Sequence, residues 1–331
     1  MTVAFESLNS IRLALNEKDY PDEDVNLNPQ LSLEVYLDGE KSSLVADKKS
    51  NQISKKVDVA VIRPRVNPKA KEGFGNTRAT PYLKHEDIEL VKNIPKTTKL
   101  DYRKSTYNSL FKNNRNDVLD VKDFLVGNEA ILLDLFQRTD LAKIKQVTPG
   151  KAIEGILKIE KNDCELEDVI DLLTKFDVLK VLFDSIRNAL GESSIKKTLI
   201  LLYQICSLVR ADRKNFVRWA KKEAYKLYKK RVLGMVTLLN STGREVAKVN
   251  ERKETLVFTI KNLDKISKGQ RDILSFVSQL CATEYELIYT NSKTHAIFII
   301  DEIFDFLDET NLLAAQYYIS KFIKDFKRVK K

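Results

Sequence analysis

Runs of apolar residues predict short strands in both end regions of the chain. In residues 31–37, Leu and Val alternate with polar residues and Tyr, which is the pattern of a strand with one buried face. Asp38-Gly39 is a candidate type I′ turn, and residues 43–46 supply a returning strand. Residues 57–64 and 255–260 are further strand candidates. We expect 31–37, 43–46 and 57–64 to form one small antiparallel sheet.

A short apolar run, Ala296–Ile300, ends on two adjacent carboxylates, Asp301 and Glu302. An apolar run without alternation predicts a strand that is buried on both faces. In open α/β sheets, ligands bind beyond the carboxyl ends of the strands. We therefore expect the two carboxylates to line a ligand site. The alternative is a strand that ends on exposed acids without a function.

Helical spacing of apolar residues predicts a helical block over about 117–240 and further helices over 5–15 and 317–326. Gly191 and the polar residues after it separate two helices of the block. No heptad pattern continues for three or four repeats, so we expect a compact lobe or a short arm and not a long coiled coil. The polar, turn-rich segment 65–115 is expected to be a long loop.

The segment Lys261–Asp272 leads into a helix whose apolar residues continue to Leu280. Ser267 lies at the predicted start of this helix, and Gly269 lets the backbone come close to a ligand. A helix N-terminus with a hydroxyl group and a glycine is favourable for binding an anion. The alternative is that Ser267 is an ordinary N-cap. Gly269-Gln270 goes beyond what a plain cap needs, which favours the anion site.

Together, these two segments resemble the signature motif, Walker B motif and D-loop of ATP-binding-cassette (ABC) ATPases, especially the chromosome-maintenance and RecF-like branch. The family's signature, Leu-Ser-Gly-Gly-Gln, aligns with Ile266–Gln270 and differs at the first and third positions. The Walker B acids align with Asp301 and Glu302. The D-loop aligns with Asp305, Phe306, Leu307 and Asp308.

The resemblance implies an α/β fold, namely a P-loop NTPase head of ABC type with a mixed sheet, antiparallel flanking strands and a helical insertion. Residues 1–64 and 251–331 would form the ATPase lobe, and residues 65–250 would form a loop region and the helical insertion or arm. ATP and Mg²⁺ are the implied cofactors. The implied activity is ATP hydrolysis coupled to dimerisation of two heads, in DNA repair or anti-phage defence.

In such a head, Asp301 would hold Mg²⁺ through its water shell. Glu302 would orient the water that attacks the γ-phosphate. The signature residues would contact the nucleotide of the opposite head, so that ATP joins a homodimer: Ser267, Lys268, Gly269 and Gln270.

Two parts of the family's pattern have no counterpart in the sequence. No G-x-x-x-x-G-K-[ST] phosphate loop occurs, and His85 and His295 both precede Asp301, so neither can be the switch histidine that follows the D-loop in the family. Two interpretations stay open: a chain whose start has been lost, and a variant that never had the loop. The alternative function is a non-hydrolysing interaction or nucleic-acid-binding protein derived from such an ATPase.

Residues 212–231 carry nine basic residues against two acidic ones, in a chain with a net charge of +10. The segment also contains four aromatic residues, Phe216, Trp219, Tyr225 and Tyr228. Basic and aromatic side chains together suit a phosphate backbone and unpaired bases. The alternative is a solvated helix whose aromatic side chains pack inward. The candidate nucleic-acid contacts are Lys221, Lys222, Lys229 and Lys230.

Composition excludes several classes of protein. With 43% hydrophobic and 31% charged residues, the chain is globular and not disordered. Three scattered cysteines and two histidines argue against a disulfide framework, a zinc site and Cys-His or serine-hydrolase chemistry. No apolar run is long enough to cross a bilayer. We expect a cytoplasmic protein whose partners are a second copy of the chain, DNA or RNA, and an effector protein, without a membrane.

Overall fold

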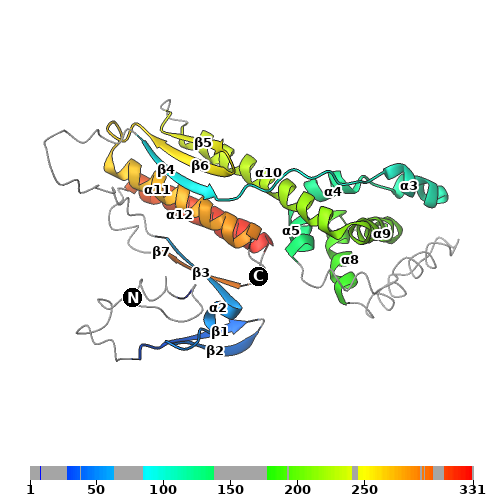
Figure 1. Ribbon diagram of the computed structural model, residues 1–331, viewed down its shortest axis with the longest axis horizontal. Helices are drawn as coiled ribbons and strands as arrows, with labels where there is room; N and C mark the ends of the chain where they lie inside the picture. The colour runs from blue at the N-terminus through cyan, green and yellow to red at the C-terminus, as the bar shows by residue number, and fades with distance from the viewer. Residues whose placement is uncertain are drawn as a thin grey trace. The chain divides into compact units, whose positions relative to one another are not determined.

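Helices and small sheets, with both parallel and antiparallel strands, make up the computed structural model (Figure 1). It describes Leu8 and residues 28–37, 39–62, 85–137, 177–191, 194–240, 245–290, 293, 295–300 and 309–329. The chain divides into two units. Unit 1 consists of Met1–Ile94 and Lys230–Lys331, and unit 2 of Pro95–Lys229. Unit 2 begins and ends inside the segment that we predicted as an insertion, 65–250.

Unit 1 contains an antiparallel hairpin of β1 (Leu31–Leu37) and β2 (Glu40–Ala46), which confirms the two predicted strands. Gly39 in the turn has φ +89°, a conformation that glycine adopts without a steric penalty. The turn type stays a prediction because Asp38 lies outside the described residues. The hairpin is followed by α2 (Ile53–Lys56), and Ile53 packs into the same apolar cluster as the buried residues of β2.

The strand β3 (Val57–Ile62) pairs in parallel with β7 (His295–Ile300), from Val57↔His295 to Ile62↔Ile300. Our prediction that 57–64 joins the hairpin sheet is therefore wrong. The physical reason is that α2 separates β2 from β3, and β3 is largely apolar on both faces, which suits a parallel pair. The strand over 296–300 is confirmed. Its predicted burial on both faces is wrong, because every residue of β7 is partly exposed and β3 is its one neighbouring strand in the described part of the chain.

The second sheet of unit 1 has three antiparallel strands in the order β4-β6-β5. They are β4 (His85–Val91), β5 (Ala247–Arg252) and β6 (Thr255–Lys261). The strand predicted at 255–260 is confirmed as β6. The predicted loop over 65–115 is wrong where β4 lies, because HEDIELV alternates charged and apolar residues and one face of it can be covered. It is also wrong over 104–110 and 112–115, which are helical.

The signature segment leads into α11 (Lys268–Glu284), which continues as a short π-helix, η5 (Tyr285–Thr290). α11 contacts β3, β4, β6 and the final helix, α12 (Glu309–Val329) (Figure 1). The helix predicted after the D-loop is thus confirmed as α12. The apolar residues of α11 face inward: Ile273, Leu274, Phe276, Val277 and Leu280 are buried.

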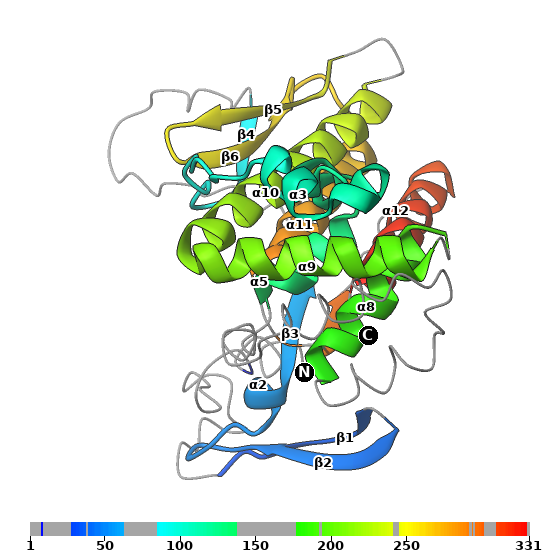
Figure 2. The same cartoon turned by 90° about the vertical axis from the view of Figure 1, so that its right-hand side faces the viewer.

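Unit 2 is helical in its described part, which confirms the predicted helical block there (Figure 2). Gly191, with φ +68°, separates α8 from α9 as predicted, and these two helices pack together. α10 belongs to unit 2 up to Lys229 and to unit 1 from Lys230. The elements are α3 (Lys104–Leu110), η3 (Lys112–Asp117), α4 (Val121–Gly127), α5 (Glu129–Gln137), α8 (Asp177–Ala189), α9 (Ile195–Ala211) and α10 (Arg213–Leu239).

The predicted helix over 5–15 lies outside the described residues, apart from Leu8. Among the helices that the structure describes, we find none whose length and hydropathy would allow it to cross a bilayer.

Candidate functional site

The structure describes the signature segment and the four candidate lysines, but not the acidic half of the predicted site. Asp301, Glu302, Asp305, Leu307 and Asp308 all lie outside the described residues. β7 ends at the residue directly before Asp301, and it runs parallel to β3. The proximity of these acids to the signature segment stays a prediction.

Ser267 is the N-cap of α11 and forms a capping box with Gln270. Oγ of Ser267 accepts a hydrogen bond from the backbone N–H of Gln270, and Oε1 of Gln270 accepts one from the backbone N–H of Ser267, both at 3.1 Å. A capping box satisfies two N–H groups at the start of a helix. Our prediction that Gln270 goes beyond what a cap needs is therefore wrong, since a glutamine at this position is half of the box. The capping role is confirmed, and the phosphate role stays a prediction.

The signature residues are accessible at the start of α11. Ser267, Lys268 and Gln270 are exposed, and Gly269 is partly exposed. The N-terminus of a 17-residue helix carries a partial positive charge that favours anions. The capping box leaves the Ser267 hydroxyl proton available for donation, since Oγ acts in the box as an acceptor.

Arg271 ties the first turn of α11 to the preceding loop. Its Nη2 donates a hydrogen bond to the carbonyl oxygen of Leu263 at 2.8 Å. Its backbone N–H donates one to the carbonyl oxygen of Ser267 at 3.0 Å. Burial raises the pKa of the Glu86 carboxyl on β4, and the positive charge of Arg271 partly offsets this effect. Oε2 of Glu86 is buried without a hydrogen-bond partner among the described residues.

The aromatic residues of the basic segment are buried, with exposed fractions between 0% and 7%. They are Phe216, Trp219, Tyr225 and Tyr228. Buried rings offer no surface on which a base can stack. The prediction that they contact unpaired bases is therefore wrong, and the alternative of inward-packed aromatic side chains is confirmed.

One face of α10 within unit 2 carries four basic residues, the α10 stripe: Lys214, Arg218, Lys221 and Lys222. Their spacing places them on one side of the helix, and all four are exposed or partly exposed. Nζ of Lys222 lies 5.0 Å from the ring centroid of Tyr225. Lys229 is partly exposed and Lys230 is exposed. Lys230 follows Lys221 by nine positions, about two and a half turns, so the side chains of Lys221 and Lys230 leave opposite sides of α10.

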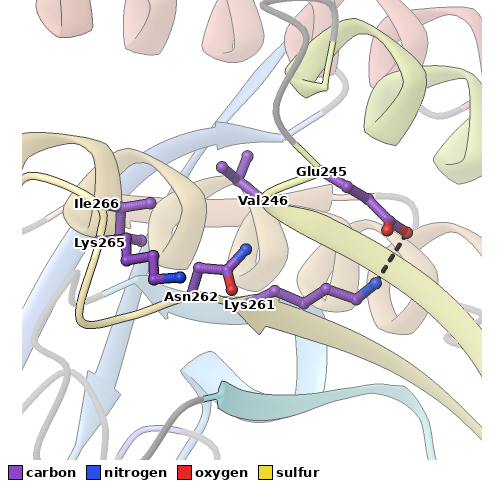
Figure 3. A pocket seen from close by; sticks show the side chains of 6 residues that line it. All are labelled: Glu245, Val246, Lys261, Asn262, Lys265 and Ile266. Carbon is purple, nitrogen blue, oxygen red and sulfur yellow. Dashed lines mark ion pairs between the residues drawn. The ribbon is translucent and has the colours of Figure 1, made fainter.

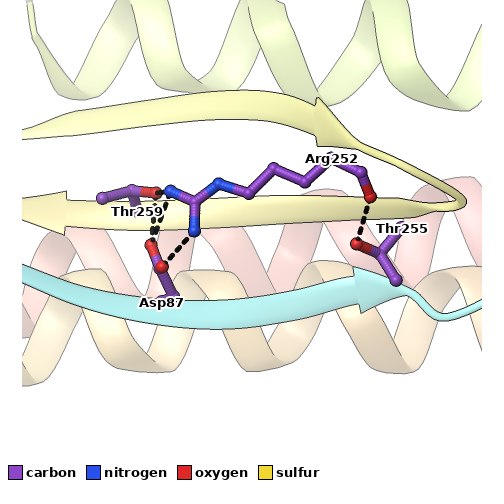
Figure 4. Close-up of polar contacts among 4 residues, drawn as sticks. All are labelled: Asp87, Arg252, Thr255 and Thr259. Atoms are coloured by element: carbon purple, nitrogen blue, oxygen red, sulfur yellow. Dashed lines mark hydrogen bonds and ion pairs between the residues drawn. The ribbon is translucent and has the colours of Figure 1, made fainter.

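A polar network on the three-stranded sheet was not predicted from the sequence (Figure 4). Asp87 on β4 accepts a hydrogen bond from the hydroxyl of Thr259 at 2.6 Å and forms an ion pair with the guanidinium of Arg252. Nη2 of Arg252 donates to the hydroxyl of Thr259 at 3.4 Å. These interactions connect all three strands. The hydrogen bonds to Thr259 and Arg252, together with the charge of Arg252, lower the pKa of Asp87, against desolvation.

Two pockets adjoin one another on this three-stranded sheet. The larger, of about 760 Å³, is lined by Glu245, Val246, Lys261, Asn262, Lys265 and Ile266 (Figure 3). The smaller, of about 360 Å³, is lined by His85, Lys248, Asn250, Arg252, Thr259, Lys261 and Asn262. The alternation of Lys248, Asn250 and Arg252 along β5 is the one signal in the sequence that points to this face, because residues two apart lie on the same side of a strand.

Within the ranges that the structure describes, no group of three or more His, Cys, Asp or Glu side chains is arranged to hold a metal ion. Comparisons with known protein families, with curated proteins and with solved structures gave no match to this chain.

Proposed function

We propose that this chain is the signature and Walker B part of an ABC-class ATPase head of the RecF/chromosome-maintenance type, which binds and hydrolyses ATP between two heads. The observation that carries the proposal is the accessible N-terminus of α11, where Ser267, Lys268 and Gln270 are exposed in the order of the family's signature. The parallel β3–β7 pair, which ends directly before Asp301 and Glu302, supports it. The expected partners are a second copy of the chain and an effector protein, in cytoplasmic DNA repair or anti-phage defence.

The proposed role of α11 is to bind the γ-phosphate of the nucleotide on the opposite head. The hydroxyl of Ser267 and the ammonium of Lys268 would donate to the phosphate oxygens, and the helix dipole would favour the anion. Because each head would contribute to the other's site, ATP would hold the dimer together and hydrolysis would release it. Asp301 would hold Mg²⁺ through water, and Glu302 would orient the attacking water.

The sequence holds no phosphate loop, so this proposal requires one from another part of the protein or from a partner chain. The DNA upstream of Met1 gives the first test: an in-frame G-x-x-x-x-G-K-[ST] supports the hydrolysing ATPase. The second test is sedimentation velocity of the resulting protein with and without ATP and Mg²⁺, for which we expect an ATP-dependent dimer. Absence of such a loop, together with no ATP binding by the chain, would overturn the proposal and leave the non-hydrolysing interaction protein.

A second candidate function, binding of the nucleic-acid backbone, is favoured by the α10 stripe. Four cations on one accessible side of a helix suit the phosphates of DNA or RNA. Since the neighbouring aromatic side chains are buried, we expect binding through phosphates without base stacking, and hence without strong sequence preference.

A further inference from the structure

The two pockets on the three-stranded sheet adjoin one another, since Lys261 and Asn262 line both. We call the two together the sheet pocket. None of its lining residues belongs to the signature tetrad, Ser267–Gln270. The sheet pocket is thus distinct from the four residues proposed to contact ATP, although Ile266, which aligns with the first position of the signature, lines it.

Four cations line the sheet pocket: Lys248, Arg252, Lys261 and Lys265. Two carboxylates oppose them. Glu245 forms an ion pair with Lys261 at 2.8 Å (Figure 3), and Asp87, beside the pocket, pairs with Arg252 (Figure 4). The four cations therefore exceed the two carboxylates, and the imidazole of His85 adds a further polar group.

The two ion pairs differ in how firmly they are held. Asp87 is fixed by Thr259 as well as by Arg252, across three strands. The Glu245 carboxylate is 61% exposed and has Lys261 as its ion-pair partner. The hydrogen bond from Lys261 and its charge lower the pKa of Glu245. An exposed pair of this kind contributes little to stability. A ligand anion that reaches Lys261 can therefore displace Glu245 at small cost.

The backbone after Lys261 turns at Asn262. Asn262 has φ +54°, in the left-handed region, and its carbonyl oxygen accepts a hydrogen bond from the N–H of Lys265 at 2.8 Å. This turn carries Lys265 to the same pocket as Lys261. Asparagine tolerates the left-handed region better than most residues, which explains its presence here.

We propose that the sheet pocket binds an anion with two or more phosphate groups, and that Glu245 competes with this anion for Lys261. A phosphate group carries one to two negative charges and is bound by lysine and arginine together, whereas a single carboxylate would leave most of the four cations without a ligand partner. Pockets of roughly 300–1,000 Å³ suit small ligands. Val246 and Ile266 give the larger pocket an apolar wall for the remainder of the ligand.

The test is isothermal titration calorimetry with inorganic tripolyphosphate as the probe. Lys261→Ala and Lys265→Ala should each weaken binding by about tenfold, because each removes one charge-assisted contact. Glu245→Gln should tighten binding, because it removes the competing carboxylate and keeps the shape. Lys49→Ala is the matched control: it removes one exposed lysine of the same unit far from the lining residues in the sequence, and we expect no change.

Two further arms identify the source of the phosphates. A short oligothymidylate that displaces tripolyphosphate and is sensitive to the same variants would indicate a nucleic-acid strand. Displacement by free nucleotides alone would indicate a small phosphorylated ligand. Either result supports the proposal. It is overturned if tripolyphosphate does not bind, or if Lys261→Ala and Lys265→Ala bind as well as Lys49→Ala. This titration needs neither ATP nor a dimer, whereas the proposed ATPase is tested by ATP-driven dimerisation, so failure here is distinguishable from failure of the proposed ATPase.

Discussion

The backbone N–H of Ser267 donates to the side chain of Gln270, and the backbone N–H of Gln270 donates back to the hydroxyl oxygen of Ser267, each at 3.1 Å. The same two residues are proposed to contact a phosphate. Capping alone would account for both, so a test must change the charge of the site and keep the cap. Aspartate caps helices about as well as serine, but its carboxylate repels a phosphate.

We therefore predict that Ser267→Asp leaves the free energy of unfolding within about 0.5 kcal/mol of the original and abolishes ATP-driven dimerisation. Ser267→Ala should instead cost about 1 kcal/mol, because the cap is lost. Ser267→Arg should also abolish dimerisation, by bulk. Thermal unfolding and sedimentation velocity with ATP are the measurements. A Ser267→Asp protein that still dimerises with ATP would contradict the sandwich.

Gln270→Glu tests the other half of the capping box in the same way, by adding a charge and keeping the cap. Glutamate at this position keeps the box and adds a negative charge next to Ser267. We expect unchanged stability and weaker ATP-driven dimerisation. Gln270→Glu with wild-type dimerisation would assign Gln270 to capping alone.

Local patterns in the sequence predicted most elements correctly, because capping and alternation depend on residues close together in the chain. The hairpin of β1 and β2 and the start of α11 at Ser267 are examples. Pairing between distant segments was not predictable. Nothing in residues 57–62 identifies His295–Ile300 as the parallel neighbour of β3, and the pairing of β4 with β6 is equally remote.

In the candidate sites too, local relations were predictable from the sequence and contacts between distant segments were not. Ser267 and Gln270 lie three residues apart, so the sequence alone could have predicted their capping box. We assigned Gln270 to ligand binding instead. The sheet pocket joins His85, Lys248 and Lys261 from three strands, and it becomes visible only once the register is known. The burial of Trp219 among basic neighbours likewise depends on tertiary packing.

Glu302→Gln should slow ATP hydrolysis strongly in a protein that has a phosphate loop. The amide keeps the size of the side chain but cannot accept a proton from the attacking water, and loss of a general base typically costs about 10²–10⁴-fold in rate. ATP binding and ATP-driven dimerisation should persist, and the dimer should dissociate more slowly. Phosphate release measured at saturating ATP is the assay. Unchanged turnover would exclude Glu302 as the base.

Neutralising the α10 stripe should weaken nucleic-acid binding and reduce its dependence on salt. Each lost phosphate contact lowers the slope of log K against log salt by about 1, so Lys214→Gln, Arg218→Gln and Lys221→Gln combined should lower it by about 3. Fluorescence anisotropy of a labelled duplex across about 50–200 mM salt is the measurement. Lys230→Gln is the control, since Lys230 lies on the side of α10 opposite Lys221. If the control lowers the slope equally, the stripe is a solvated helix face and not a nucleic-acid site.

Arg231 should matter far more for stability than its neighbour Lys226, although both form short ion pairs from α10. Arg231 pairs with Glu284 at 3.1 Å and with Asp325 at 3.5 Å, and the Glu284 side chain is only 6% exposed. Removing one partner of a buried pair costs about 3–5 kcal/mol, so we expect this loss for Arg231→Met in urea unfolding. Lys226→Met, whose 57% exposed side chain pairs with Glu223, should cost less than about 1 kcal/mol. Similar costs for the two variants would contradict this ranking.

Glu86 gives a prediction for the pH dependence of stability. Burial raises the pKa of its carboxyl above the usual value of 4.5, so the folded state binds this proton more tightly than the unfolded state. The resulting contribution to stability is fully present below pH 4.5 and is lost as the pH rises through the raised pKa. Glutamine does not ionise, so Glu86→Gln does not lose this contribution to stability as the pH rises. We therefore expect its melting temperature to be about 1–3 °C above that of the original protein at about pH 7 and equal to it at about pH 4.

The matched control for this prediction is Glu89→Gln, because Glu89 is an exposed residue of the same strand, β4. We expect it to leave the melting temperature unchanged at both pH values. Part of the pH dependence will remain in Glu86→Gln, because burial also raises the pKa of Asp272, against the charges of Lys268 and Arg271. A Glu86→Gln protein that is less stable at about pH 7 would show that Arg271 depends on the Glu86 charge. In that case, the attraction between Glu86 and Arg271 would outweigh the cost of burying the carboxylate.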